Sequence, residues 1–307
     1  MTGGTCEKVT KERENMPKVR TCDSPYMVPT TRFEEYKKKY ADHFILERSE
    51  SGVLMAKWHT NGDSLIWDLP VHRAIHQLTT DVGQDVETEV FILTGAGHNW
   101  VGQFGPECEM MDQPENRGWA SYEHQFYDGT NIVEGLVNDI EVPTIGAING
   151  PGFHFDPALV CDITIMSEDA VLLDGHFREG AVPGDGIQIA FRECMGLKRS
   201  TYAMLMCEKI DAEKALYYGM VNEVVPKDKI YERAWEIGEQ LAKSNRILRR
   251  VTTQVLRGPW KRALAWELRN AFGAEMFAYL ASGFAHGGAA HDNIVKSTGT
   301  KLLGEEA

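Results

Sequence analysis

The chain lacks the cysteine patterns that would bind zinc or form a disulfide framework. Its six cysteines include no C-x-x-C pair and no spacing typical of metal ligands. It also lacks an N-terminal apolar segment of the kind that directs secretion, and no run of about eighteen apolar residues could span a bilayer. These absences predict a cytoplasmic protein with reduced thiols, no membrane contact and no bound metal or cofactor.

Positively charged residues are scarce as well. There are 32 Lys and Arg residues against 45 Asp and Glu residues, a formal net charge of −13. This charge repels phosphate backbones, so nucleic acid is not an expected partner. With 43% hydrophobic and 25% charged residues, the 307-residue chain otherwise has the composition of a soluble globular protein. A small molecule is therefore the expected ligand.

Changes in composition divide the chain into three parts. Residues 1–40 are a polar arm with little periodicity, apart from a short helix expected at 31–40. Residues 41–226 begin with a hairpin that has Gly52 at its turn and continue as a series of short apolar strands. Residues 227–307 have the apolar periodicity of helices. We therefore expect a core flanked by an N-terminal arm and a C-terminal helical region.

Segments of helical length separate several of the apolar strands. Buried strands are predicted at residues 88–94, 142–148, 158–167 and 171–173. Helices are predicted at residues 68–80, 119–139 and 187–194. Continuous apolar strands that alternate with helices are typical of a sheet that is covered on both faces. The sequence thus predicts an α/β core.

Segment 171–186, VLLDGHFREGAVPGDG, carries the strongest catalytic signal. A strand end leads there into a loop rich in glycine and proline, with His176 and Asp185 nine residues apart. Glycines permit the positive φ values that fold a loop back on itself, so these two side chains could meet. A carboxylate on one ring nitrogen leaves the other nitrogen free to take a proton from water. The alternative is a surface turn with a solvated histidine and an aspartate that caps the next helix.

Five segments carry a family resemblance: ILTGAGHNW, IEVPTIGAINGPG, CDITIMSEDAVL, GAVPGDG and ALYYGMVNEVVP. Their order and approximate spacing resemble the crotonase (enoyl-CoA hydratase/isomerase) superfamily. The resemblance covers residues 44–225 and, by type, the helical tail. It implies an α/β fold that is a crotonase-like spiral of ββα repeats with a C-terminal helical trimerisation region. It also implies a homotrimer or a hexamer.

Two loops depart from the CoA-using members of that superfamily. Those members carry A-x-A-D-[IL]-K and N-G-x-A-x-G-G-G, and backbone N–H groups of both loops hold the thioester oxygen. This chain has GAGHNWVGQFG and NGPGFHFDPALVCD instead. The hydratases' first catalytic glutamate falls near Asp156, which we interpret as a turn or capping residue, and the second aligns with His176. The resemblance therefore implies a member that uses no CoA.

One branch with this altered set is the 6-oxocamphor hydrolase type of β-diketone hydrolase. SLIWDLPVH resembles that branch's S-L-V-W-x-x-x-x-H, and HFREGAVPGDG resembles its H-F-x-x-G-x-V-P-G-D-G. The resemblance implies catalytic roles for His176, Asp185 and Glu275 and substrate binding by Trp67 and His72. We add His154 to the substrate-binding residues from its loop alone. The alternatives, taken without the resemblance, are a core position for Trp67, exposed helix positions for His72 and Glu275, and an exposed loop position for His154.

The implied reaction is a retro-Claisen hydrolysis of a cyclic or bicyclic 1,3-diketone to a keto acid. Asp185 would orient His176, and His176 would deprotonate the attacking water. Hydrogen bonds donated by Trp67, His72 and His154 would hold the carbonyl oxygens. Glu275 would bind substrate or water, or supply the proton that the enolate needs.

Two other functions stay open. The chain could be a CoA-dependent crotonase, such as an enoyl-CoA hydratase or an acyl-CoA hydrolase, if the altered loops still hold a thioester. It could also be a non-enzymatic paralogue that binds RNA or has a structural role. The acidic charge argues against RNA, and a histidine beside a carboxylate argues against an inactive site.

Overall fold

The centre of the structure is a six-stranded sheet with the order β1-β2-β4-β6-β7-β10. The structure is a computed structural model that describes residues 28–282, so part of the predicted arm and of the predicted helical region lies outside it. The strands are β1 (Phe44–Arg48), β2 (Val53–Trp58), β4 (Val90–Gly95), β6 (Thr144–Ile148), β7 (Ile163–Ser167) and β10 (Glu223–Val225). β1 and β2 form the predicted antiparallel hairpin, and the other neighbours run parallel. Every residue of β4 and β6 is buried, which explains their continuous apolar sequences.

A short strand and a helix follow each of the first long parallel strands. After β2 come β3 (Ile66–Trp67) and α3 (Leu69–Gln84), and after β4 comes β5 (Gln103–Phe104), which pairs with β3 in parallel. The helical segment that follows β5 is η1 (Pro106–Asp112), α4 (Arg117–Ala120), the π-helical η2 (Ser121–Asp128) and α5 (Gly129–Asn138). This repetition confirms the predicted crotonase-like spiral of ββα units.

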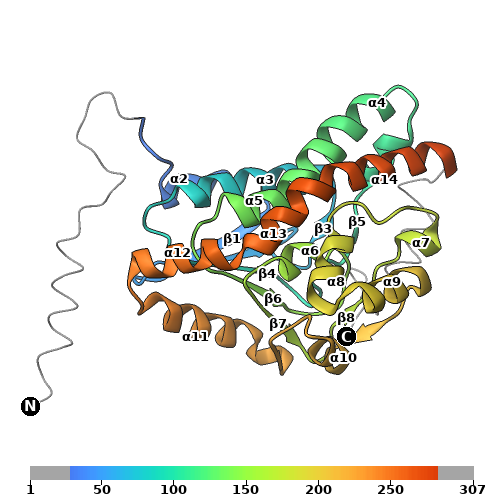
Figure 1. The fold of residues 1–307 in the computed structure, drawn as a ribbon. Helices are drawn as coiled ribbons and strands as arrows, with labels where there is room; N and C mark the ends of the chain where they lie inside the picture. The colour runs from blue at the N-terminus through green and yellow to red at the C-terminus, as the bar shows by residue number, and fades with distance from the viewer. Residues whose placement is uncertain (1–27, 283–307) are drawn as a thin grey trace, which may run out of the picture.

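The strand predicted at 171–173 is present but does not belong to the large sheet. It is β8 (Val171–Leu172), which pairs antiparallel with β9 (Ile210–Asp211). Short helices lie within and around segment 171–186. They are α6 (Asp156–Leu159), α7 (His176–Glu179), α8 (Ile187–Met195), α9 (Leu197–Met206) and α10 (Ala212–Tyr218). The loop between α7 and α8 therefore lies at the edge of the core rather than within the sheet (Figure 1).

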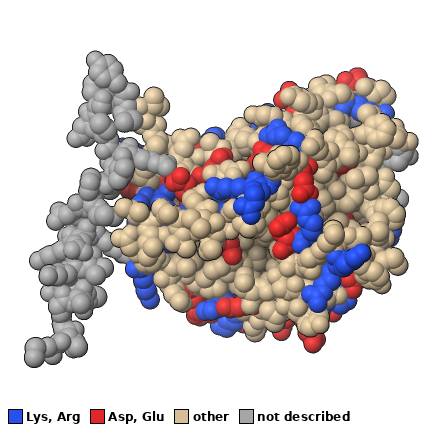
Figure 2. Space-filling model, in the orientation of Figure 1, with Lys and Arg blue, Asp and Glu red and all other residues tan. Residues whose placement is uncertain are grey.

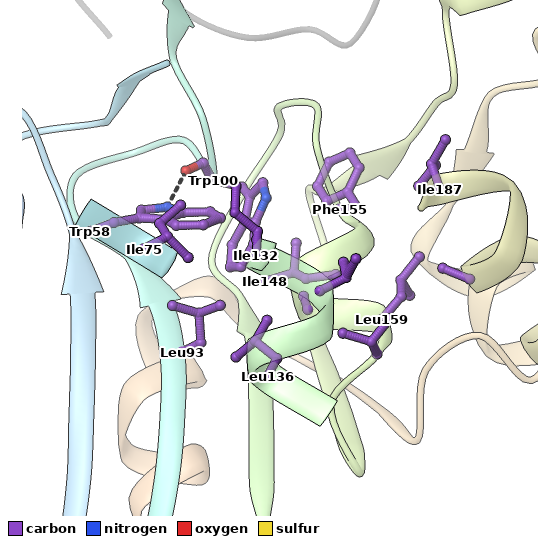
Figure 3. Packing of buried hydrophobic residues seen from close by; sticks show 14 of the residues in the cluster. Trp58, Ile75, Leu93, Trp100, Ile132, Leu136, Ile148, Phe155, Leu159 and Ile187 are labelled. Carbon is purple, nitrogen blue, oxygen red and sulfur yellow. Dashed lines mark hydrogen bonds between the residues drawn. The ribbon is translucent and has the colours of Figure 1, made fainter. Parts of the chain in front are cut away.

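Helices cover both faces of the large sheet. The helix η3 (Lys227–Lys229) leads into α11 (Ile230–Ala242), which packs Ile230, Ala234 and Ala242 on one face against side chains of β2, β4 and β6. On the other face, a larger core joins α3, α5, α6 and α8 (Figure 3). Trp58 and Trp100 are fully buried in it, and the Trp58 indole N–H donates to the Trp100 carbonyl oxygen at 2.7 Å. The core therefore fixes the loops that follow β2 and β4.

The end of the predicted arm is helical and packs on the core. The helix α2 (Phe33–Lys39) confirms the short helix expected at 31–40. Two buried tyrosine hydroxyls fasten this segment to α3 and the residue that follows it: Tyr36 donates to Asp85 and Tyr40 to Asp81, each at 2.6 Å. Residues from 33 onward therefore belong structurally to the core.

The described part of the C-terminal region, up to residue 282, is helical as predicted. It consists of α12 (Arg246–Leu256), α13 (Gly258–Ala263), η4 (Leu264–Leu268) and α14 (Arg269–Ser282). The last of these runs along the margin of the molecule (Figure 1), and Phe272 of α14 meets Phe126 of η2 with 5.9 Å between the ring centroids. Within residues 28–282 no helix has the length and apolar character needed to cross a membrane. On the face drawn in Figure 2, charged side chains of both signs are interspersed.

Candidate active site

One cavity brings together all six side chains that the sequence predicted for the site. It lies between α3 and η2 on one side and the loops around α6 and α7 on the other, with α14 beside it. The six are Trp67, His72, His154, His176, Asp185 and Glu275. The cavity wall also includes residues that the sequence analysis did not select, chiefly Gln125, Asp156, Asp174, Phe272 and Tyr279. The roles of all of these residues stay predictions, but their proximity is a property of the fold.

The carboxylate on the His176 ring is Asp174, not the expected Asp185. Asp174 Oδ1 lies 2.5 Å from His176 Nδ1, whereas Asp185 Oδ2 lies 3.9 Å from His176 Nε2. Asp174 is 3% exposed and also lies 3.4 Å from the His176 backbone N–H, so it fixes both the ring and the start of α7. Burial lowers the pKa of His176, but Asp174, Asp185 and Glu275 together outweigh burial and raise that pKa well above its usual range.

Asp185 instead lies closer to His154. The distance from Asp185 Oδ2 to His154 Nδ1 is 3.4 Å, and the Ile187 backbone N–H donates to Asp185 Oδ1 at 3.1 Å. Burial opposes ionisation of Asp185, but the hydrogen bond to His154 and the charge of His176 hold its pKa below the usual range. Asp185 therefore does contact the start of the next helix, as the alternative reading required, and also faces two imidazoles.

His154 is held rigidly in an unusual backbone conformation. Its φ is +52°, a left-handed value that costs a non-glycine residue energy and that often marks functional sites. Its carbonyl oxygen accepts a hydrogen bond from the Trp100 indole N–H at 2.9 Å. Its ring stacks on Trp67 with 4.2 Å between centroids. A chain of aromatic contacts thus runs from the buried Trp58 and Trp100 to the cavity wall and fixes His154 there.

Glu275 is buried rather than solvated. It is 2% exposed on α14, and its two carboxyl oxygens accept hydrogen bonds from the Gly184 backbone N–H at 3.1 Å and from the Tyr279 hydroxyl at 2.5 Å. A Cβ at residue 184 would lie 2.3 Å from the Ala271 carbonyl oxygen, so only glycine permits this close approach. Burial raises the pKa of Glu275 to about 8, although His176 opposes the rise. Glu275 therefore retains its proton at neutral pH.

The geometry gives His72 a different hydrogen-bonding role from the one predicted. Its Nδ1 lies 3.1 Å from the His124 carbonyl oxygen, which can only accept, so the ring proton is on Nδ1. Burial lowers the pKa of His72 to about 4, so the ring stays neutral at pH 7. Its buried Nε2 has no partner in the described structure. This nitrogen accepts a hydrogen bond, and the expectation that His72 donates to a carbonyl oxygen is wrong for this tautomer.

Two groups of side chains come close enough to hold a cation. One is His154, Asp156 and Asp185, the other is His176, Asp185 and Glu275, and within each group the potential ligand atoms lie within 4.8 Å of one another. Each group contains a histidine within 3.9 Å of a carboxylate. Such pairing between imidazoles and carboxylates accounts for both clusters, so we assign neither to a metal.

Several site residues had only weak sequence signals. Asp174 lies two residues before His176 in the same segment, which also contains two other carboxylates, so the sequence does not show which of them contacts the ring. Tyr279 lies one helical turn after Glu275, a spacing at which helix side chains meet. Gln125 comes from a π-helical segment, which local sequence patterns do not reveal. Its buried Oε1 has no partner in the described structure.

Comparison with known proteins places this chain in a family. The model of the family described as "Enoyl-CoA hydratase/isomerase" matches residues 72–282. A solved β-diketone hydrolase from the cyanobacterium Anabaena sp. PCC 7120, bound to (S)-3-oxocyclohexyl acetic acid, is 33% identical. That match covers 80% of this chain and 96% of the other, with a TM-score of 0.74.

CoA-related proteins are similar as well. The crystal structure of an enoyl-CoA hydratase/isomerase from Mycobacterium paratuberculosis has a TM-score of 0.71, and the match covers 83% of this chain and 98% of that chain. Because the sequences are only 20% identical, this match supports the fold alone. A hydroxycinnamoyl-CoA hydratase-lyase of Pseudomonas fluorescens is 24% identical over 200 residues, which are 64% of this chain and 71% of that protein. Because the family model spans more than half of the chain, and the identity to the cyanobacterial hydrolase reaches 33%, this chain belongs to the enoyl-CoA hydratase/isomerase (crotonase) family.

Proposed function

We propose that this protein is a CoA-independent hydrolase that cleaves a carbon–carbon bond of a cyclic or bicyclic 1,3-diketone and yields a keto acid. The observation that carries the proposal is the convergence of two histidine–carboxylate pairs, His176–Asp174 and His154–Asp185, on one largely apolar cavity. The similarity to a β-diketone hydrolase from Anabaena supports the same substrate class.

His176 is the base in this mechanism. Asp174 accepts a hydrogen bond from His176 Nδ1–H and so fixes the tautomer, which leaves Nε2 on the side of Asp185 and Glu275. Nε2 takes a proton from water, and the hydroxide attacks one ketone. The tetrahedral intermediate then collapses. The bond that breaks joins the attacked carbon to the carbon that lies between the two carbonyl groups, and the second ketone accepts the electron pair as an enolate. The carboxylates around His176 stabilise the imidazolium that forms.

The remaining polar groups of the cavity bind the oxygens. Trp67 offers its indole N–H as a donor for a carbonyl oxygen, and His154, whose Nδ1 faces Asp185, stacks on the Trp67 ring and orients it at the wall. His72, with its bare Nε2, suits a hydroxyl instead, such as that of the tetrahedral intermediate. Glu275 carries a proton near neutral pH and lies 3.9 Å from His176 Nε2, so it is in place to exchange protons with the imidazole.

The alternative is a CoA-dependent crotonase, an enoyl-CoA hydratase or acyl-CoA hydrolase. The similarity to a hydratase-lyase named for a CoA substrate favours it. Against it stand the two loops, GAGHNWVGQFG and NGPGFHFDPALVCD, which differ from the thioester-binding sequences of CoA-using members. The two functions differ in their products, so one labelling experiment separates them.

Incubation with a bicyclic 1,3-diketone in ¹⁸O-labelled water, without CoA, is expected to give a keto acid with one labelled oxygen. The label enters because the hydroxide that attacks the ketone becomes part of the new carboxyl group. Mass spectrometry of the product measures it. A parallel incubation with a panel of enoyl-CoA and acyl-CoA thioesters is the comparison. Turnover of a thioester with no cleavage of any diketone would reject the proposal in favour of the CoA-dependent alternative.

The variant Asp174→Asn is expected to move the acid limb of the kcat/KM profile to lower pH. Asp174 raises the pKa of His176, so in the wild type the neutral base appears only above the ordinary histidine pKa of about 6.5. Removal of that negative charge lowers the pKa, and activity persists to lower pH. The maximal kcat/KM falls by about tenfold or more, because an amide also permits the wrong tautomer. Stopped assays across pH measure both effects.

The variant Asp185→Asn serves as the comparison for this profile. Its carboxylate lies 3.9 Å from His176, so its removal is expected to shift the limb less than removal of Asp174 does. A limb that moves with Asp185 and stays in place with Asp174 would assign the orienting role to Asp185 after all.

We also propose that the chain assembles as a homotrimer or hexamer in the cytoplasm. Members of this family are typically oligomeric. On α12, exposed apolar side chains recur at helical spacing, at Ile247, Val251 and Val255, where a solvated helix would carry polar residues.

A further inference from the structure

Asp156 is a buried carboxyl group to which the mechanism above gives no role. It is 5% exposed, lines the cavity, and lies at the first position of the four-residue helix α6. Its Oδ1 is fully buried and has no hydrogen-bond partner in the described structure. The nearest ionisable neighbours are His154, whose Nδ1 is 3.9 Å from Asp156 Oδ1, and Asp185. A turn or capping role leaves this oxygen unexplained.

The surroundings of Asp156 and Asp185 favour a single negative charge on the pair, and they place it on Asp185. Asp185 has an imidazole at 3.4 Å, a second at 3.9 Å and a backbone N–H at 3.1 Å. Asp156 Oδ1 has none of these at hydrogen-bond distance. Two buried carboxyl groups this close do not both ionise, and the better-solvated one takes the charge. In agreement, burial and the charge of Asp185 raise the pKa of Asp156 well above its usual range.

We propose that Asp156 is held as a carboxylic acid and donates its O–H to the ketone oxygen on which negative charge develops as the carbon–carbon bond breaks. This inference rests on the proposed function. The described structure offers its buried Oδ1 no acceptor, so the acceptor comes from the ligand. A neutral acid in a buried site stabilises an oxyanion without competing for its charge, and here it substitutes for the backbone donors of the altered loops.

The proton inventory closes over one turnover. As the carbon–carbon bond breaks, its electron pair forms the enolate double bond, and the carbonyl π pair moves to oxygen. That oxygen takes the Asp156 proton and becomes an enol. The enol carbon then receives the proton that His176 took from water, while the enol O–H proton returns to Asp156. The net reaction adds one water, and both residues regain their starting states.

Infrared difference spectra of the free protein at neutral pH test the protonation directly. Wild type minus Asp156→Asn is expected to contain the C=O band of a carboxylic acid, which shifts in D₂O. Glu275→Gln is the matched control, because Glu275 is the other protonated acid of the cavity and must remove a separate band. A carboxylate band in place of the acid band would overturn the proposal. This measurement needs no substrate, so it is independent of whether diketones are cleaved.

Kinetics with two variants test the donor role. Asp156→Asn keeps an N–H donor at nearly the same position, whereas Asp156→Leu has similar size and no donor. With the diketone we expect kcat to fall about 10²–10³-fold in the leucine variant and at least about tenfold less in the asparagine variant, with KM little changed. Equal losses in the two variants would overturn the donor role. Thermal unfolding of both variants shows whether they fold. If the leucine variant does not fold, the test is the infrared carbonyl stretch of a ¹³C-labelled diketone bound to wild type and to Asp156→Asn. A stretch in wild type that is not shifted to lower frequency contradicts the proposal. If wild type neither binds nor cleaves diketones, the proposed function fails, and the assigned ligand oxygen fails with it, whatever the free-protein spectrum contains.

Discussion

The variant His176→Ala is expected to lose about 10²–10⁴-fold in kcat/KM toward a 1,3-diketone, the usual contribution of a positioned general base. The loss falls on kcat, because the imidazole acts on water rather than on the substrate's binding groups. Trp67 and the His154 ring stacked on it remain in place at the cavity wall, so KM changes little. Steady-state kinetics with mass-spectrometric detection of the keto acid measure both constants.

Controls separate catalysis from folding in this variant. The matched control is His43→Ala, a histidine that lies next to β1 and outside the cavity wall, which should leave kcat and KM unchanged. Free imidazole, which fits the space that the truncated side chain leaves, is expected to restore part of the activity. Retention of wild-type kcat in His176→Ala would remove this residue from the mechanism. A loss of activity that is accompanied by a large fall in the unfolding temperature would point to a structural role.

The sequence predicted the main elements because each has a local signature. The apolar runs that become β4 and β6 are buried on both faces, and the periodic pattern after Asp68 becomes α3, with Asp68 itself at the helix start. The hairpin follows from Gly52, whose φ is +87°. β8 shows the limit of such patterns. An apolar triplet indicates a strand, but only the tertiary structure decides which sheet it joins.

The site residues were predictable as a set, but their pairing was not. A glycine-rich loop indicates that His176 can meet a nearby carboxylate, yet the loop contains three candidates. Asp174 is the partner because the turn of α7 directs the His176 ring back toward it, with 2.5 Å between His176 Nδ1 and Asp174 Oδ1. The burial of Glu275 could not be predicted from the local sequence either. Its neighbours in α14 give no clear apolar face, and it is buried because the helix returns across the cavity, where Gly184 admits it.

Arg257→Met is expected to lower the free energy of unfolding by about 3–5 kcal/mol, the usual cost of removing one partner from a buried ion pair. Arg257 is 1% exposed at the junction of α12 and α13, and its guanidinium donates two hydrogen bonds to Asp162, at 2.5 and 2.8 Å. It also donates to four backbone carbonyl oxygens and one hydroxyl, of Leu136, Val137, Ile140, Val142 and Thr144. Methionine replaces the length of the side chain and none of these donors, so the Asp162 charge and the carbonyl oxygens lose them together.

Guanidinium chloride unfolding at constant protein concentration measures the loss as a shift of the midpoint. The matched control is Arg233→Met, because Arg233 makes a similar two-bond pair with Glu223, at 2.7 and 2.9 Å, but in contact with solvent. Exposed pairs contribute little, so the control should unfold near the wild-type midpoint. Adding Asp162→Asn to Arg257→Met should recover part of the loss, because the second change removes the partly buried charge that the first one leaves without its counter-ion. Equal midpoints for the two methionine variants would mean that burial gives the Arg257–Asp162 pair no special weight, and that the C-terminal helices are fastened to the sheet by apolar contacts alone.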